Sequence, residues 1–335
     1  MTSTAYILLY LTSIILSGCG PAEIPASSDT ANPSRTTESP QAVESPSDTP
    51  EPVTPAVVLA ADETILDANF LSSLSHQLQE QGFALNIQSS LDSSALPSGI
   101  QYLLTTSTSD LLSVQNDLPD LPILSLSAVH GENENTQHLL YTNAYHQRAA
   151  FLAGYTSAFL TPDYRTGYVD LVGSEISGLF DAYGNGNTYY CGHCSPQYPP
   201  YIDYPAYVQL SEPYTSEKIS AVLSTLQQES VTTVYLHPFI HSEELNQSLK
   251  DAGLKLIGNQ LLIVETNPLF DLIIGPDSSA VTEEILPALT QGVIPEPLSP
   301  PAGVLINSGW ISDGRMQHLD EIIKMLNEGS ILPVE

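Results

Sequence analysis

Two stretches decide the fold: AAFLAGY at residues 149–155 and TGYVDLVG at residues 166–173. In the first region the small residues Gly154 and Ala158 are four positions apart, so on a helix they share one face and permit close packing on a neighbour. Ordinary helix packing would be enough to explain them. The second stretch is a short apolar run ending in glycine, as in a buried strand of a parallel sheet. Together they predict a helix followed by a buried strand.

The same alternation extends in both directions along the chain. Helices are expected over residues 70–78 and 319–326, and after Ser216 and Ser242, which can serve as N-caps. The expected strands are residues 57–60, 102–106, 123–126, 167–172, 206–210, 231–236, 254–257, 269–274 and 304–306. Continuous apolar strands alternating with amphipathic helices indicate parallel sheets covered on both faces. Because about nine strands are expected, we predict two sheets.

The N-terminal residues predict export. Residues 5–18 form an apolar run that is too short to span a membrane but fits a secretion signal. The run ends in Leu-Ser-Gly before Cys19, which resembles a bacterial lipobox, although no Lys or Arg precedes it. A plain signal peptide or a chance cysteine is the alternative. Residues 19–56 contain eight prolines among Ser, Thr and acidic residues, which is typical of an extended tether.

These features predict four regions in order. Residues 1–18 would be a lipoprotein signal peptide, and residues 19–56 a lipidated cysteine followed by a linker. Residues 57–165 would form a first α/β lobe and residues 166–335 a second, with late segments crossing back to the first. The protein would then be extracytoplasmic and anchored to a bacterial cell membrane by its N-terminal lipid.

The charge balance excludes some functions. The 335 residues include 38 acidic and 8 basic side chains, giving a formal net charge of −30. Binding a phosphate backbone requires clustered Lys and Arg, so a nucleic-acid partner is excluded, as is a polybasic membrane surface. A cationic partner is permitted, but an acidic surface is as often a means of staying soluble.

The fold-deciding stretches resemble the Bmp/PnrA-like family of basic membrane lipoproteins, in which a FLAGxxAA helix precedes a GxVGxVGG strand. Two further segments are similar to that family: DANF at residues 67–70 and LNEGSILP at residues 326–333. The resemblance implies a two-lobed type I periplasmic-binding-protein-like fold. It also implies an ABC-transporter substrate-binding protein that captures a small ligand for a permease or a sensor, with no catalysis and no cofactor.

Ligand contacts are expected where strands end, because ligands of open α/β sheets bind outside the carboxyl ends of the strands. This rule selects Asp62, Thr106, Ser174, His237 and Asn259.

The resemblance adds two ligand contacts, Asp67 and Phe70, with Phe70 stacking on a nucleoside base. The alternative for Phe70 is a core position on an amphipathic helix. Three family positions that would contact a nucleoside differ here: Leu71 replaces Asn, Asn259-Gln260 replaces Val-Asp, and Gly275-Pro276-Asp277 lacks a basic residue.

Residues 191–194, CGHC, have the spacing of a thiol–disulfide oxidoreductase site. That chemistry requires a thiolate at a helix N-terminus. The Gly/Asn-rich residues before the motif and the prolines after it predict a loop, so we expect a structural disulfide between Cys191 and Cys194. An exported oxidoreductase is the alternative.

Two further patterns were weighed. Eight of the 17 tyrosines lie between Tyr183 and Tyr214, in an expected loop that could contact a ligand or a partner protein, or simply pack on itself. A ligand-free interaction module acting through this loop is therefore a second hypothesis. His237 and His241 are four apart, but Pro238 favours a loop over a metal-binding helix, and no metal site is predicted.

Overall fold

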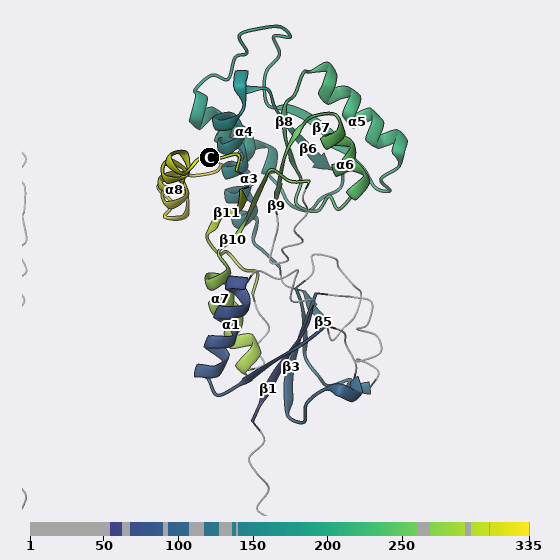
Figure 1. Cartoon of the computed structure of the whole chain (residues 1–335), viewed down its shortest axis with the longest axis vertical. Coiled ribbons are helices and arrows are strands. Elements are labelled where there is room, and N and C mark those ends of the chain that lie inside the picture. Colours follow the sequence, from purple (N-terminus) through teal and green to yellow (C-terminus); the bar gives the residue numbers. More distant parts are fainter. Residues whose placement is uncertain are drawn as a thin grey trace, which may run out of the picture. The chain divides into compact units, whose positions relative to one another are not determined.

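The computed structural model describes residues 54–61, 68–89, 93–106, 117–126, 136–138, 140–259, 269–291, 296–307 and 309–334. Within them, the first sheet has five parallel strands in the order β2-β1-β3-β4-β5. The strands are β1 (Ala56–Ala60), β2 (Ala84–Gln88), β3 (Ile100–Thr105), β4 (Ile123–Ser125) and β5 (Thr136–His138). Figure 1 shows helices α1 (Ala68–Glu80) and α7 (Ser278–Gln291) side by side in this half.

The second sheet has six strands in the order β11-β10-β9-β8-β6-β7, of which only β11 is antiparallel to its neighbour. Its strands are β6 (Thr166–Leu171), β7 (Ala206–Leu210), β8 (Thr233–Leu236), β9 (Lys255–Asn259), β10 (Leu272–Pro276) and β11 (Ala302–Asn307). The remaining longer helices are α3 (Asn143–Leu160), α4 (Leu179–Cys191), α5 (Ser216–Gln228), α6 (Glu243–Asp251) and α8 (Asp313–Asn327). The predicted α/β fold with two helix-flanked parallel sheets is confirmed.

The nine expected strands are present, and β2 and β5 were not predicted. The side chains of β2 alternate between exposed and half-buried, so the strand lacks the continuous apolar run on which the prediction relied. Helix α7 was also missed. It buries Val281, Ile285 and Leu289 in one core with strand β1, although it follows β10 of the second sheet.

The chain changes sheets earlier than the expected boundary at residue 165. Helix α3, which that boundary assigns to the first lobe, packs in the core of the second sheet with Tyr168 and Tyr235. Three connecting segments are joined by backbone hydrogen bonds. Thr142 donates to Leu298 (2.8 Å), Leu298 donates to Leu140 (2.8 Å), and Asp277 donates to Pro301 (2.8 Å).

Helix α4 corrects the expected loop after Tyr183. The glycines that suggested a loop instead let α4 pack directly on α3. A Cβ atom at Gly186 would overlap the carbonyl oxygen of Phe151 and lie 2.7 Å from the backbone nitrogen of Tyr155. A Cβ atom at Gly154 would lie 2.8 Å from the backbone carbon of Tyr183. The two helices therefore meet backbone to backbone, which only glycine permits at these positions.

Two helix starts illustrate local capping. The Ser242 side chain accepts a hydrogen bond from the Leu245 N–H (3.2 Å), so the expected cap of α6 is present. At α5 the cap is Thr215, one residue before the expected Ser216, because the Thr215 side chain accepts from the Lys218 N–H.

Replacing the Ser242 cap tests this local effect. Ser242→Ala should lower the free energy of unfolding by about 1 kcal/mol, because it leaves an N–H of the first turn of α6 without its acceptor. Chemical denaturation followed by circular dichroism measures the change. Ser220→Ala, an exposed position within α5, is the control and should change stability by less than about 0.5 kcal/mol. Equal effects at both positions would contradict a capping role.

No helix in the described part of the chain is both long enough and apolar enough to cross a membrane.

Candidate functional site

A row of tyrosines crosses the second sheet on the face that α3 and α4 cover. Tyr168 of β6 is in register with Tyr207 of β7 and with Tyr235 of β8, and Tyr235 is in register with Ile257 of β9. Tyr168 and Tyr235 are fully buried, with ring centroids 5.6 Å apart. Aromatic side chains on neighbouring strands pack well, and they fix the register of the strands they join.

Two residues further along each strand, at the carboxyl edge, this row is replaced by polar side chains: Gln209, Asp170, His237 and Asn259. We call these four residues the carboxyl-edge row. Because side chains alternate along a strand, they lie on the same face as the tyrosines.

The tyrosine hydroxyls bond to the carboxyl-edge row. Asp170 accepts from the Tyr207 hydroxyl (2.6 Å) and from the Tyr168 hydroxyl (3.3 Å). The Asn259 amide donates to the Tyr235 hydroxyl (3.4 Å), and Gln209 donates to the Tyr207 hydroxyl (2.9 Å). The row is thus held in place from below.

The start of α3 brings three more side chains to this edge, Tyr141, Tyr145 and His146. The Phe239 ring contacts both imidazoles, with its centroid 5.8 Å from that of His146 and 5.7 Å from that of His237. The Tyr145 ring lies 4.8 Å from Tyr141 and 5.3 Å from His146, centroid to centroid. The edge is therefore lined by a chain of five rings from two parts of the sequence.

Buried polar atoms without partners are concentrated here. Five such atoms at this edge find no hydrogen-bond partner among the described residues: the hydroxyls of Tyr141 and Tyr145, Nδ1 of His146, Nε2 of His237 and Oδ1 of Asn259. Leaving a buried polar group unbonded costs about 1–3 kcal/mol. A concentration of these groups at the carboxyl edge of a parallel sheet is typical of a ligand site.

The two histidines are held neutral. Burial lowers the pKa of His146 from 6.5 to about 4, and the nearby His237 lowers it further. Burial also lowers the pKa of His237 to about 4, although Asp170 opposes this shift and His241 adds to it. Nδ1 of His237 accepts from the Phe239 N–H (3.1 Å), so in the neutral ring Nε2 carries the hydrogen. His237 therefore offers a buried N–H donor.

Acidification should destabilise the fold through this pair. Both pKa values are lower in the folded state than the ordinary 6.5, so the unfolded chain binds more protons between about pH 6.5 and pH 4. The stability contributed by neutral burial is therefore complete above pH 6.5 and is lost as the pH falls toward 4. Urea denaturation at several pH values should show this loss. In the variant His146→Gln/His237→Gln the slope should be smaller, and an unchanged slope would contradict the assignment.

The sequence-predicted site residues are dispersed in the structure. His237 and Asn259 belong to the carboxyl-edge row. Thr106 follows β3 in the first sheet, where its N–H donates to the Ala60 carbonyl (3.3 Å), and Ser174 follows β6, where its hydroxyl accepts from the Ile176 N–H (3.2 Å). Phe70 is fully buried in the core of the first sheet, so its ring has no exposed surface to offer a ligand.

Three predicted residues, Asp62, Asp67 and Cys19, lie outside the described residues. Tyr141, Tyr145 and His146 were missed because the strand-end rule considers only residues that follow a strand of the same sheet. Their signal in the sequence is an aromatic, polar first turn, TNAYH at residues 142–146, in front of an otherwise small and apolar helix.

The disulfide between Cys191 and Cys194 is present, at the C-terminal end of α4. A helix C-terminus does not stabilise a thiolate, whereas oxidoreductase sites place the reactive cysteine at an N-terminus. This geometry supports a structural bond.

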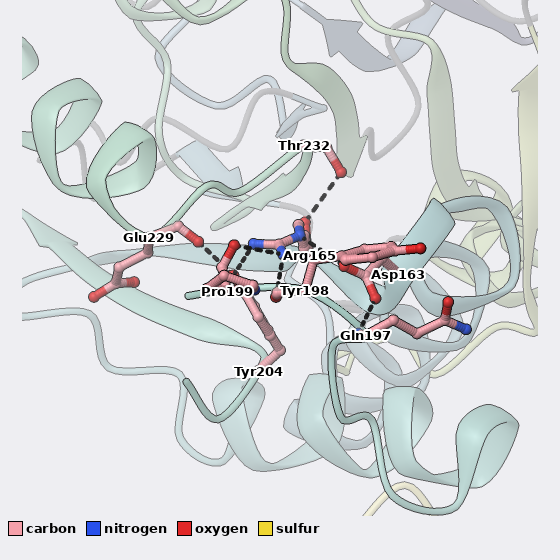
Figure 2. Close-up of polar contacts among 8 residues, drawn as sticks. All are labelled: Asp163, Arg165, Gln197, Tyr198, Pro199, Tyr204, Glu229 and Thr232. Atoms are coloured by element: carbon pink, nitrogen blue, oxygen red, sulfur yellow. Dashed lines mark hydrogen bonds and ion pairs between the residues drawn. The ribbon is translucent and has the colours of Figure 1, made fainter. Parts of the chain in front are cut away.

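The tyrosine-rich stretch after the disulfide is anchored by one arginine, as Figure 2 shows. The Arg165 guanidinium donates to the carbonyls of Tyr198 (2.6 Å) and Pro199 (3.2 Å), to the Tyr204 hydroxyl (3.2 Å) and to Asp163 (3.0 Å). Asp163 in turn accepts from the Gln197 N–H. Arg165 lies at the start of β6, so this network is at the opposite edge of the sheet from the carboxyl-edge row.

A polar hollow of about 600 Å³ lies elsewhere, between α1, the start of α7 and Leu305 of β11. It includes no residue of the carboxyl-edge row. Among the described residues, no three side chains of His, Cys, Asp or Glu are grouped as a metal site would require.

Comparisons with known proteins bear on the fold. The sequence matches no protein-family model and no curated protein. A transcriptional activator of the comK gene from Bacillus halodurans is similar in structure, with a TM-score of 0.51 and 12% identity, covering 83% of this chain and 99% of that one. This likeness supports the type I periplasmic-binding-protein fold.

Two weaker structural similarities were found. The first is to an ABC transporter periplasmic solute binding protein from Actinobacillus succinogenes with bound D-allose, with a TM-score of 0.41, 10% identity and coverage of 76% of this chain and 97% of that one. The second is to a LacI family transcriptional regulator from Enterococcus faecium with bound ribose, with a TM-score of 0.36, 15% identity and coverage of 75% and 96%.

Proposed function

We propose that this protein is an extracytoplasmic solute-binding lipoprotein of the Bmp/PnrA-like kind. It would capture a small ligand at the carboxyl edge of the second sheet and present it to an ABC permease or a sensor. The observation that carries the proposal is the group of five buried polar atoms there that lack partners among the described residues. A ligand that bonded to them would recover the free energy that their burial costs.

The mechanism would be closure of two lobes with no covalent chemistry. The connecting segments at residues 140–142 and 296–301 are paired through Leu298, and short connections of this kind absorb the backbone rotation in hinged proteins. Arg148 joins this connection to α3, because its guanidinium donates to the carbonyls of Ser299 (2.9 Å) and Pro300 (2.9 Å). A movement of the hinge would therefore also move the α3 side chains of the site.

The sequence-predicted contacts in the first lobe complete the proposal. Asp62, Asp67 and Thr106 come from that lobe, and Ser174 from the second. Cys19 would carry the lipid that anchors the protein, with residues 19–56 as its tether. Metabolic labelling with a radioactive fatty acid tests the anchor, since the label should be lost in Cys19→Ser.

Ligand capture is tested on protein purified without denaturation. Native mass spectrometry should find a bound small molecule that is released on unfolding. Adding it back at 100 times its Kd should stabilise the fold by about 2.7 kcal/mol. His237→Phe should lose this stabilisation, because it removes the Nε2–H donor, whereas Tyr198→Phe at the opposite edge should keep it. A protein that carries no ligand and is stabilised by none would contradict the proposal.

A second candidate is a protein-interaction role for the tyrosine-rich surface. Residues 182–202 contain no Asp, Glu, Lys or Arg, although the whole chain contains 38 acidic residues. Within this stretch Tyr198 is 68% exposed and Tyr201 is 73% exposed. Depletion of charge with exposed tyrosine is the composition of interface centres.

Crosslinking tests that role. A photo-crosslinking amino acid at position 201 should capture one defined protein in cells, while the same amino acid at exposed Ser220 should not. Equal labelling at both positions would count against an interface.

A further inference from the structure

The groups at the carboxyl edge also restrict the chemistry of the ligand. Their hydrogen-bonding capacity is mixed: Nε2 of His237 donates, Oδ1 of Asn259 accepts, and the hydroxyls of Tyr141 and Tyr145 can do either. A ligand hydroxyl group has the same double capacity. A carboxylate or phosphate only accepts and would leave Asn259 without a partner.

No positive charge is free to receive an anion at this edge. Of the seven Lys and Arg residues that the structure describes, Arg148 is the nearest to the site. One terminal nitrogen of its guanidinium, Nη2, already donates to Ser299 and Pro300, and its charge faces the carboxylate of Glu284. Lys218 follows β7 by a few residues, but its ammonium donates to the carbonyls of residues 211, 212 and 213.

The other five basic residues are engaged elsewhere. Arg165 is in the network at the opposite edge of the sheet, and Lys250 and Lys255 both pair with Asp271. Lys324 pairs with Glu328, and Arg315 lies over the Phe159 ring.

The charges that do face the site are negative. Asp170 stands in the carboxyl-edge row, and Glu284 faces Tyr141 and Arg148. With both imidazoles neutral, these groups sum to one positive and two negative charges. An anionic ligand would have to be buried against that field with no cation free to pair with it, which costs several kcal/mol.

We propose that the ligand is an uncharged molecule that carries several hydroxyl groups, and that carboxylates and phosphates are rejected. The five rings Tyr141, Tyr145, His146, Phe239 and His237 would supply apolar surface for its carbon skeleton, while their polar atoms and Asn259 bind its hydroxyls. This inference rests on the proposed solute-binding function and narrows it to one ligand class.

Matched pairs of probes test the inference by calorimetric titration of the full-length protein. The pairs are D-ribose with D-ribose 5-phosphate, D-glucose with D-gluconate, and uridine with uridine monophosphate. In at least one pair the neutral member should bind, and its anionic partner should bind at least 10-fold more weakly. His237→Phe should weaken the neutral member by a similar factor, and Tyr198→Phe should leave it unchanged.

The possible results separate this inference from the function on which it rests. If an anionic member binds as tightly as its neutral partner, or more tightly, the inference is overturned while solute binding stands. If no member of any pair binds, and the purified protein releases no small molecule, both are overturned. If a neutral member binds equally well to His237→Phe and to the unaltered protein, the ligand class stands but its placement at this edge is overturned.

Discussion

Replacing Arg165 with methionine should lower the free energy of unfolding by about 3–5 kcal/mol, the cost of breaking a buried ion pair by removing one partner. Arg165 is 9% exposed and holds Tyr198, Pro199, Tyr204 and Asp163 through one guanidinium. Methionine has a similar length but no donor. The variant would leave two carbonyls without their partner and a carboxylate without its counter-charge.

The effect of Arg165→Met should also be local. The segment between the disulfide and β7 is held to β6 by Arg165, so its backbone amides should exchange hydrogen faster in the variant. Arg165→Lys keeps the charge but not the fork of donors, and should fall between the two. Urea denaturation and hydrogen exchange measure both quantities.

Arg315→Met is the matched control for Arg165→Met. Arg315 is exposed and its guanidinium lies 5.2 Å from the centroid of the Phe159 ring, so its loss should cost no more than about 1 kcal/mol. A similar loss in both variants would show that Arg165 is not the anchor.

The sequence predicted the two-sheet fold because its signal is spread over many residues. Each buried parallel strand, such as 206–210 or 123–125, is a short apolar run, and the helices between them show a separate periodicity. The same reasoning failed at α4, where GNGN at residues 184–187 has the composition of a turn. What decides that segment is contact with α3, a helix distant in the sequence, and composition carries no information about that contact.

The candidate site was predictable only in the part that follows strands. His237 and Asn259 are at strand ends and could be selected by position. His146 could not, because it stands within α3, and its relation to His237 depends on how that helix packs over the sheet. Arg165 had no motif at all, since its partners are backbone carbonyls more than 30 residues away.

Close packing of α3 on α4 leads to the other large effect. Gly186→Ala should lower the free energy of unfolding by about 3 kcal/mol or more, at or above the upper end of the usual cost of overpacking. The added methyl group would overlap the Phe151 carbonyl and approach the Tyr155 backbone nitrogen to 2.7 Å. Both are backbone atoms of α3, so no side-chain rotation can relieve the overlap and the helices must separate.

Gly184→Ala, two residues earlier in the same helix, is the matched control. A Cβ atom there meets nothing within 4 Å, so alanine should stabilise α4 by up to about 1 kcal/mol through its better helix propensity. Opposite signs at Gly184 and Gly186 would separate contact from propensity, whereas a loss of similar size at both would contradict the packing argument.

The double variant Gly154→Ala/Gly186→Ala tests the mechanism further. Gly154 faces the Tyr183 carbonyl from the other helix, so both methyl groups would push the same pair of helices apart. Once the first has separated them, the second should cost less than it does alone. The two losses should therefore be less than additive, as for residues that share one interface. Fully additive losses in urea denaturation would mean that each glycine acts on a different contact.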